Sequence, residues 1–275
     1  MHARSLPMLA FIGALAACAK KEAAPPPGPN VVTIVATDFA FALPDTLPPG
    51  LTTFRLANAG AEPHHSVLVK LAEGKTLADF QAAAMSEKMP DWMTFPGSPA
   101  AVMPNDTSNT TTTLEPGQYV LVCYVPSSDG VPHIAKGMVR PFVVAGAAPA
   151  VAAAEPQADI TVTLSDYAFA FSTPLTGGPH TVRVENAGPQ LHAIEIERLA
   201  DGKTLQDYVA WGKAGMKGPP PTTSAGGLIG PTKGQHAYFN VNLAPGNYLV
   251  VCYVPDEKDQ KPHVAHGMIQ ELTIN

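Results

Sequence analysis

The sequence that decides the fold is a stretch that occurs twice, YVLVCYVPSSDGVPHIAKGM at residues 119–138 and YLVVCYVPDEKDQKPHVAHGM at residues 248–268. Each copy opens with an apolar run rich in β-branched residues, which is typical of a buried strand, and the run ends at a cysteine. A proline-containing turn then leads to a histidine, and a methionine follows five residues later. This pattern indicates one structural unit that is used twice.

The similarity extends outward over most of the chain. Residues 37–41 recur at 165–169, residues 58–60 at 186–188 and residues 74–77 at 202–205, always at an offset of 128. Toward the ends of the copies the offset grows to 129 and then 130, which indicates one residue gained in each of two loops. This self-similarity predicts two tandem domains, each of about 115 residues, a normal size for a compact domain.

Both domains are predicted to be all-β. The chain holds 23 Gly and 29 Pro among 275 residues, which favours many turns between short strands. Apolar runs predict strands at 31–35, 52–56, 66–70 and 119–123, with counterparts at 160–164, 181–184 and 248–252. Residues 76–88 carry apolar side chains at helical spacing, so one short helix is expected there. The fold class is therefore two tandem Greek-key β-sandwiches, each with a short helical insertion.

The remaining segments differ from these domains in composition. Residues 145–158 are almost entirely Ala, Gly and Pro, which predicts a flexible linker and leaves open whether the two domains dock. We expect domain 1 at 31–144, domain 2 at 159–275 and a Pro-rich tether at 19–30.

The first eighteen residues predict export. A positive charge at Arg4 and an apolar stretch after it are typical of a secretory signal. The sequence LAAC at residues 15–18 resembles the lipobox of bacterial lipoproteins, which implies a signal peptide at 1–18 that ends at a lipidated Cys18. The expected location is the cell envelope, periplasmic or on the outer surface, with the membrane as a partner through the lipid anchor.

The charge of the chain limits its partners. A net charge of −6 provides no basic surface for nucleic acid, so no nucleic-acid partner is expected. The acidic surface agrees with a basic redox partner and equally with simple solubility.

Four residue types that bind soft metals recur at matched places in the two copies. Two histidines, one cysteine and one methionine per copy are the ligands of a type 1 copper site, whereas zinc prefers four strong ligands. The candidate metal ligands are His64, Cys123, His133 and Met138 in the first copy and His192, Cys252, His263 and Met268 in the second.

With these residues the chain resembles the cupredoxin family, the plastocyanin and azurin group of blue copper proteins. In that family one histidine follows an Asn-Ala-Gly-like turn, and the cysteine, second histidine and methionine lie on the last strand and the loop after it. The resemblance implies a membrane-anchored electron-transfer protein with copper as its cofactor. The loop departs from the plastocyanin pattern, because nine and ten residues separate cysteine and histidine here.

Several alternatives stay open at this point. An exported protein with two remaining cysteines usually forms one disulfide, although equivalent positions in separate domains argue against a Cys123–Cys252 bond. The same ligands suit an envelope copper carrier or sensor without a redox partner, and a metal-free binding lipoprotein would need none of them. We expect no enzyme, because neither the several His-x-His pairs of multicopper oxidases nor the second, all-histidine copper centre of nitrite reductases occurs among the nine histidines.

Overall fold

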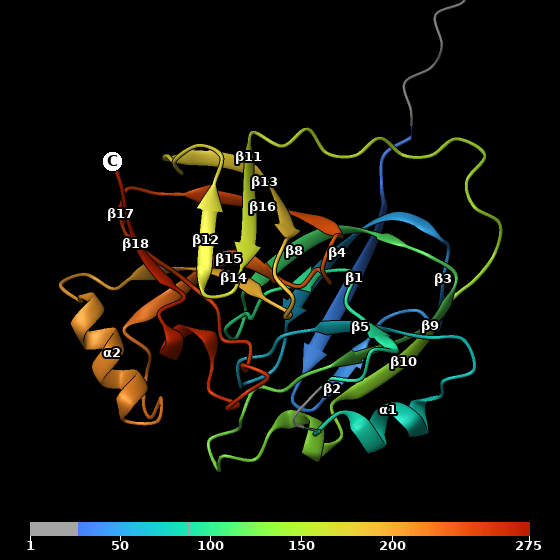
Figure 1. Ribbon diagram of the computed structural model, residues 1–275, viewed down its shortest axis with the longest axis horizontal. Helices are drawn as coiled ribbons and strands as arrows, with labels where there is room; N and C mark the ends of the chain where they lie inside the picture. The colour runs from blue at the N-terminus through green and yellow to red at the C-terminus, as the bar shows by residue number, and fades with distance from the viewer. Residues whose placement is uncertain (1–26, 87–88) are drawn as a thin grey trace, which may run out of the picture.

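The structure is a computed structural model that describes residues 27–86 and 89–275. The predicted signal peptide, the lipidation site Cys18 and most of the tether lie outside these residues. The predicted all-β class is confirmed, since strands dominate both halves of the chain and each half has one short α-helix (Figure 1). Among the described residues, no helix has the length and apolar character to span a membrane.

The first half is a sandwich of two sheets. One sheet has the order β8 (Thr107–Leu114), β4 (Gly50–Asn58), β1 (Asn30–Thr37), β2 (Ala40–Ala42); the other has β3 (Thr46–Leu47), β10 (Val139–Val144), β9 (Gly117–Val122), β5 (Val67–Leu71), β6 (Met93–Thr94). Strands β1 and β4 run parallel although they are close in sequence, so the chain crosses between the sheets as a Greek key does. Side chains alternate along β1 between buried and exposed, which places one face of the sheet in the core.

The second half repeats this arrangement. One sheet contains β12 (Ala168–Phe171), β11 (Ile160–Ser165), β13 (Gly178–Asn186) and β16 (His236–Leu243); the other contains β18 (Ile269–Ile274), β17 (Gly246–Val251), β14 (Ala193–Leu199) and β15 (Thr222–Ile229). Strand β11 is parallel to β13, as β1 is to β4. The predicted strands therefore all occur, and each cysteine follows directly after the strand that was expected to carry it.

A short helix covers one sheet in each half. Helices α1 (Leu77–Ala83) and α2 (Leu205–Lys213) both begin after a threonine whose side chain forms a capping box with an aspartate. Helix α1 ends earlier than the predicted range of 76–88. Its last turn holds the buried Ala84, but the next residue, Met85, is 63% exposed, so no packing supports a further turn.

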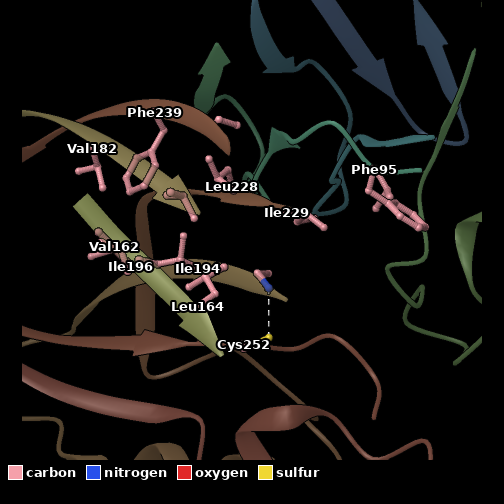
Figure 2. Close-up of a cluster of buried hydrophobic side chains, with 14 of the residues drawn as sticks. Phe95, Val162, Leu164, Val182, Ile194, Ile196, Leu228, Ile229, Phe239 and Cys252 are labelled. Carbon is pink, nitrogen blue, oxygen red and sulfur yellow. Dashed lines mark hydrogen bonds between the residues drawn. The ribbon is translucent and has the colours of Figure 1, made fainter. Parts of the chain in front are cut away.

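The two halves are joined more closely than the linker composition predicts. Strand β8 pairs with β16 and creates one sheet of eight strands, while β7 (Ser98–Pro99) of the first half adds to the second half's sheet beside β15. One buried apolar cluster contains side chains from both halves, among them Phe95 of the first half and Leu228 and Ile229 of the second (Figure 2). The linker itself is held at Glu155, which hydrogen-bonds to His236 and Tyr238. The two halves therefore pack against each other, which the sequence left open.

A buried carboxyl group lies at this junction. Glu195 on β14 is 8% exposed and pairs with Gly227, whose carbonyl accepts from the backbone N–H of Ala100 in the first half. Burial is the main cause that raises the pKa of Glu195 to about 8, and the negative charge of the neighbouring Glu197 raises the pKa further. The repeat counterpart in the first half is the apolar Val67.

This carboxyl predicts a pH dependence of stability. The folded protein holds the Glu195 proton more tightly than the unfolded chain, whose carboxyl has a pKa near 4.5. The free energy of unfolding should therefore fall between about pH 5 and pH 8, by up to about 1.4 kcal/mol per pH unit for this group. Denaturant unfolding of the metal-free protein at several pH values tests this. Glu195→Gln should flatten the slope, and an unchanged slope would contradict the assignment.

Candidate metal centres

The structure brings the three predicted nitrogen and sulfur ligands of the first half together. One ligand atom each of His64, Cys123 and His133 lie within 4.8 Å of one another, and all three side chains are fully buried. The Nδ1 atoms of His64 and His133 are 3.0 Å apart, and Cys123 Sγ lies 3.4 Å from His133 Nδ1.

The second half builds the same cluster. His192, Cys252 and His263 are fully buried, and their ligand atoms also lie within 4.8 Å of one another. The two Nδ1 atoms are 3.1 Å apart, and Cys252 Sγ lies 3.4 Å from His263 Nδ1. Two matched clusters with nearly equal distances make a chance grouping of histidines a poor explanation.

An asparagine positions the first histidine of each cluster. Asn58, the last residue of β4, donates from Nδ2 to the carbonyl oxygens of Glu62 and Val102 and accepts from the N–H of Gly60. His64 then pairs with Val102 through two backbone hydrogen bonds of 3.1 and 2.9 Å. Asn186 holds the turn before His192 in the same way. The repeated Asn-Ala-Gly turn thus fixes where the first imidazole lies.

The loop after the cysteine delivers the second histidine. In the first half this loop is closed by a bridge between Pro126 and Pro132, and His133 opens a single 3₁₀ turn, His133–Lys136. The turn ends at Gly137 in the left-handed region, with φ 96°, a conformation that glycine adopts without strain. The second half has the same bridge, turn and glycine. The long loop therefore forms a compact, ordered structure that returns to the cluster.

The two predicted methionine ligands lie beside these clusters. Met138 is fully buried in the same apolar cluster as Cys123, its N–H donates to His133, and its carbonyl accepts from Cys123. Met268 makes the equivalent backbone hydrogen bonds with His263 and Cys252. The backbone therefore ties each methionine to two of the clustered residues, and the ligand role of the thioether stays a prediction.

Carboxylates hold the outer nitrogens of the histidines. His64 Nε2 lies 3.1 Å from Asp38, and His192 Nε2 lies 3.0 Å from Asp166. These contacts leave Nδ1 of each ring free of its proton and directed into the cluster, which is how protein carboxylates orient metal-binding imidazoles. Sequence analysis missed this role, although Asp38 and Asp166 lie in the repeated segment 37–41 and 165–169 and could have been found there.

The two clusters differ at the second histidine. His133 Nε2 contacts Glu62 at 2.9 Å, but position 62 becomes Gln190 in the second half. There the nearest carboxylate is Asp256, 3.9 Å from His263 Nε2, and that nitrogen has no hydrogen-bond partner. Asp256 instead accepts from Gln190 and from the Tyr167 hydroxyl. In the second half the carboxylate nearest to His263 therefore makes no direct contact with its imidazole.

Burial sets the protonation states of the ligand groups. It raises the pKa of the Cys123 thiol to about 11 and that of Cys252 to about 12, and it lowers the pKa of His64 and His192. Without metal, burial therefore favours the neutral imidazoles of His64 and His192 and the protonated thiols of both cysteines. Metal binding has to displace the thiol proton, so its affinity should rise with pH.

The separations suit a small transition-metal ion. Nitrogen and sulfur ligands at about 2.0–2.3 Å from one ion lie roughly 3–4 Å from each other. The measured 3.0–3.1 Å between nitrogens and 3.4 Å between sulfur and nitrogen match this requirement. Both cysteines are free in the described part of the chain, which excludes the Cys123–Cys252 disulfide.

The other histidines in the described part of the chain lie outside these two clusters. His65, next to His64, accepts a hydrogen bond at Nε2 from the Tyr124 N–H at 2.7 Å, and burial lowers its pKa to about 3. Outside the clusters, histidines at three further positions pair with carboxylates at or near the surface: His180 with Asp159, His236 with Glu155 and His266 with Asp259.

Similarity to known proteins is found among solved structures alone, since no family model and no curated protein matches the chain. Auracyanin A, a "blue" copper protein from Chloroflexus aurantiacus, is 25% identical and covers 43% of this chain and 100% of its own, with a TM-score of 0.32. Reduced auracyanin from Roseiflexus castenholzii is 24% identical over 44% of this chain and 100% of its own, with a TM-score of 0.30. Each half of the chain is a two-sheet β-sandwich, and the auracyanins are blue copper proteins to which it is similar. These TM-scores are below 0.5, so the functional argument rests on the ligand geometry of the cupredoxin-like halves.

The prediction that the chain is not an enzyme was wrong. A blue copper oxidase from Nitrosomonas europaea, 14% identical, covers 89% of this chain and 85% of its own, with a TM-score of 0.22. The expectation of no enzyme rested on the missing His-x-His pairs. Copper ligands can also be distant in sequence or come from a second copy of a chain, and such ligands form no His-x-His pair. A copper oxidase is thus among the proteins to which most of this chain is similar.

Proposed function

We propose that the protein carries electrons at two copper sites, one in each cupredoxin-like half, with domain boundaries at 31–144 and 159–275. One observation supports this most strongly: in each half a buried thiol and two buried imidazoles converge, and a carboxylate orients the first imidazole. Each cluster offers a soft thiolate, two imidazoles and a nearby soft thioether, which suit copper. Among the described residues no fourth strong ligand joins either cluster, and zinc prefers four. Met138 and Met268 are the weak fourth ligands.

The residues of the chain supply the conditions for electron transfer. Copper, when bound, supplies a one-electron Cu(II)/Cu(I) couple. Buried ligand side chains exclude water, and the asparagine turns and the 3₁₀ turns hold the imidazoles in place, so little has to move when the charge changes. Asp38 and Asp166 keep the proton of each first histidine on Nε2. A basic protein is the proposed redox partner.

Reversible redox cycling tests this function. The purified protein, loaded with Cu(II), should lose its thiolate band on addition of a one-electron reductant and regain it on reoxidation, with both copper ions retained after desalting. Release of copper on reduction, without a reversible couple, would contradict electron transfer and identify a copper carrier.

Glu62 should strengthen the first site. Its carboxylate contacts His133 Nε2, and removal of such an outer partner typically lowers metal affinity 10–100-fold. Glu62→Gln should therefore weaken the first site by about tenfold or more in a competitive titration. Asp129→Asn removes a nearby carboxylate that pairs with Lys136 and is the matched control, for which no change is expected. Equal losses of copper affinity in Glu62→Gln and Asp129→Asn would contradict a specific role of Glu62, because removal of any nearby negative charge would then weaken the site.

The anchor is proposed on the sequence pattern alone. A lipidated Cys18 would place the protein in the cell envelope, periplasmic or outer-surface, as a membrane-attached lipoprotein. Stable attachment takes more than one acyl chain, which the lipoprotein modification supplies by resemblance. Cys18→Ser should leave the protein uncleaved or soluble in cell fractionation. Unchanged acylation and membrane attachment would refute the lipobox assignment.

A further inference from the structure

A third group of metal-ligating side chains lies on the loop and the 3₁₀ turn that follow Cys252. One ligand atom each of Asp256, Asp259 and His266 lie within 4.8 Å of one another, a limit that the two buried clusters also meet. Nε2 of His266 lies 3.0 Å from Oδ1 of Asp259. Asp256 is 1% exposed, whereas the side chains of Asp259 and His266 are 35% and 29% exposed. The group therefore has one buried end and one end that is open to solvent.

A buried ring nitrogen faces this group without a hydrogen-bond partner. Nε2 of His263 is fully buried and unpartnered, and it lies 3.9 Å from Oδ2 of Asp256. In the first half the equivalent nitrogen of His133 contacts Glu62 at 2.9 Å. Buried polar atoms are nearly always paired in native proteins, so an unpaired one needs an explanation. A cation held by Asp256 would lie beside this nitrogen, which is then available as a further ligand.

The equivalent loop of the first half carries different side chains at these positions. Asp129 corresponds to Asp259, because each accepts a hydrogen bond from the N–H two residues later, at 2.9 and 3.1 Å. The partner of Asp129 is the ammonium group of Lys136 at 2.8 Å, where the second half has a histidine. Ser127 stands in place of the buried carboxylate. An ammonium group offers donors only and repels a cation, so the ligand set belongs to the second half.

Tyr167 holds two of the three side chains in place. Its hydroxyl donates to Oδ2 of Asp256, and its ring packs against the ring of His266 with centroids 5.1 Å apart. Gln190 also donates to Asp256, at 3.0 Å. In the first half Phe39, which has no hydroxyl, occupies the position of Tyr167. The buried carboxylate and the imidazole are thus oriented in advance, which reduces the ordering cost of binding an ion.

We propose that Asp256, Asp259 and His266 bind a divalent cation that accepts oxygen ligands together with nitrogen, a class for which Mn²⁺ is the probe. Carboxylates suit such an ion, whereas a cluster with a thiolate favours softer metals. Lys261 pairs with Oδ2 of Asp259 at 3.0 Å and leaves Oδ1 facing His266. One lysine thus balances one of two carboxylates, and the other keeps its charge for a cation. This site is independent of the proposed function.

Titration of the metal-free protein with Mn²⁺ tests the site. Mn²⁺ is the weakest binder in the Irving–Williams order, so it discriminates against the two soft clusters. Electron paramagnetic resonance measures free Mn²⁺, and we expect one bound ion per chain. His266→Lys and Asp256→Ser introduce the side chains that the first half has at these positions. Each should lower the Mn²⁺ affinity by about tenfold or more, because even the outer partner of a metal ligand has an effect of this size.

Two control variants separate this site from the rest of the protein. His180→Lys changes a histidine that pairs with the single carboxylate of Asp159, and the Mn²⁺ affinity should stay the same. Cys123→Ser combined with Cys252→Ser alters the buried clusters and should also keep the bound Mn²⁺. Far-ultraviolet circular dichroism checks that each variant is folded. If Asp256→Ser does not fold, His266→Lys at the exposed end of the group decides the test.

Three results would overturn the inference. If the protein binds no Mn²⁺, His266 and Asp259 form an ordinary ion pair. If His266→Lys leaves the Mn²⁺ affinity unchanged, or if the double cysteine variant loses the ion, Mn²⁺ binds elsewhere. By contrast, Mn²⁺ binding that His266→Lys abolishes, in a protein that shows no thiolate band with Cu(II), would support the inference and contradict the proposed function.

Discussion

Cys123→Ser is expected to remove one of two copper equivalents together with its thiolate band, and Cys252→Ser is expected to remove the other. Each sulfur belongs to its own buried cluster, and the band requires a sulfur ligand. Serine is close in size to cysteine, so the sandwich should stay folded while the soft ligand is lost. Copper stoichiometry and visible absorption of each single variant provide the measurement.

The double variant is the control for these changes. Cys123→Ser with Cys252→Ser should bind no copper with a thiolate band, and its far-ultraviolet circular dichroism should match that of the wild type. If either single change abolished all copper binding, one site shared between the halves would have to replace the two separate centres.

His64→Ala should destroy the first centre, whereas His65→Ala should leave its band in place. His64 Nδ1 lies in the cluster, but the His65 ring accepts a hydrogen bond from Tyr124 N–H and is not among the grouped ligand atoms. Both variants are measured with Cys252→Ser, which silences the second half.

Some shift of the band in His65→Ala is compatible with this assignment. In the second half the backbone N–H at the equivalent position donates to Cys252 Sγ at 3.2 Å, and a backbone donor does not depend on the side chain. The second half has Ala193 at this position and still forms its cluster, which makes Ala the natural replacement. Loss of the band in His65→Ala and retention in His64→Ala would invalidate the repeat alignment.

The repeat explains why the sandwich and the clustered residues could be predicted from sequence. Alternation in residues 119–123 places Tyr119, Leu121 and Cys123 on one side, and all three are buried in one apolar cluster. Matched positions in two copies then distinguished His64 and His192 from His65, which has Ala193 as its counterpart. Local patterns of this kind record which face of a strand is buried.

Contacts between distant segments could not be predicted in the same way. Glu62 looks like any surface acid in the sequence, and its contact with His133 depends on how the long loop folds back. The junction of the halves depends on the short strand β7 and on Thr232, which exchanges hydrogen bonds with Phe95. The composition of the linker indicates only that the linker forms no core of its own. Whether the two halves contact each other depends on how the two sandwiches pack.

The central claim is two thiolate-ligated copper centres, and titration of the purified protein with Cu(II) tests it most directly. We predict that the intense thiolate-to-copper absorption rises linearly and saturates at two equivalents. Weak colour typical of nitrogen ligands alone, or preferential retention of zinc when both metals are offered, would contradict the account.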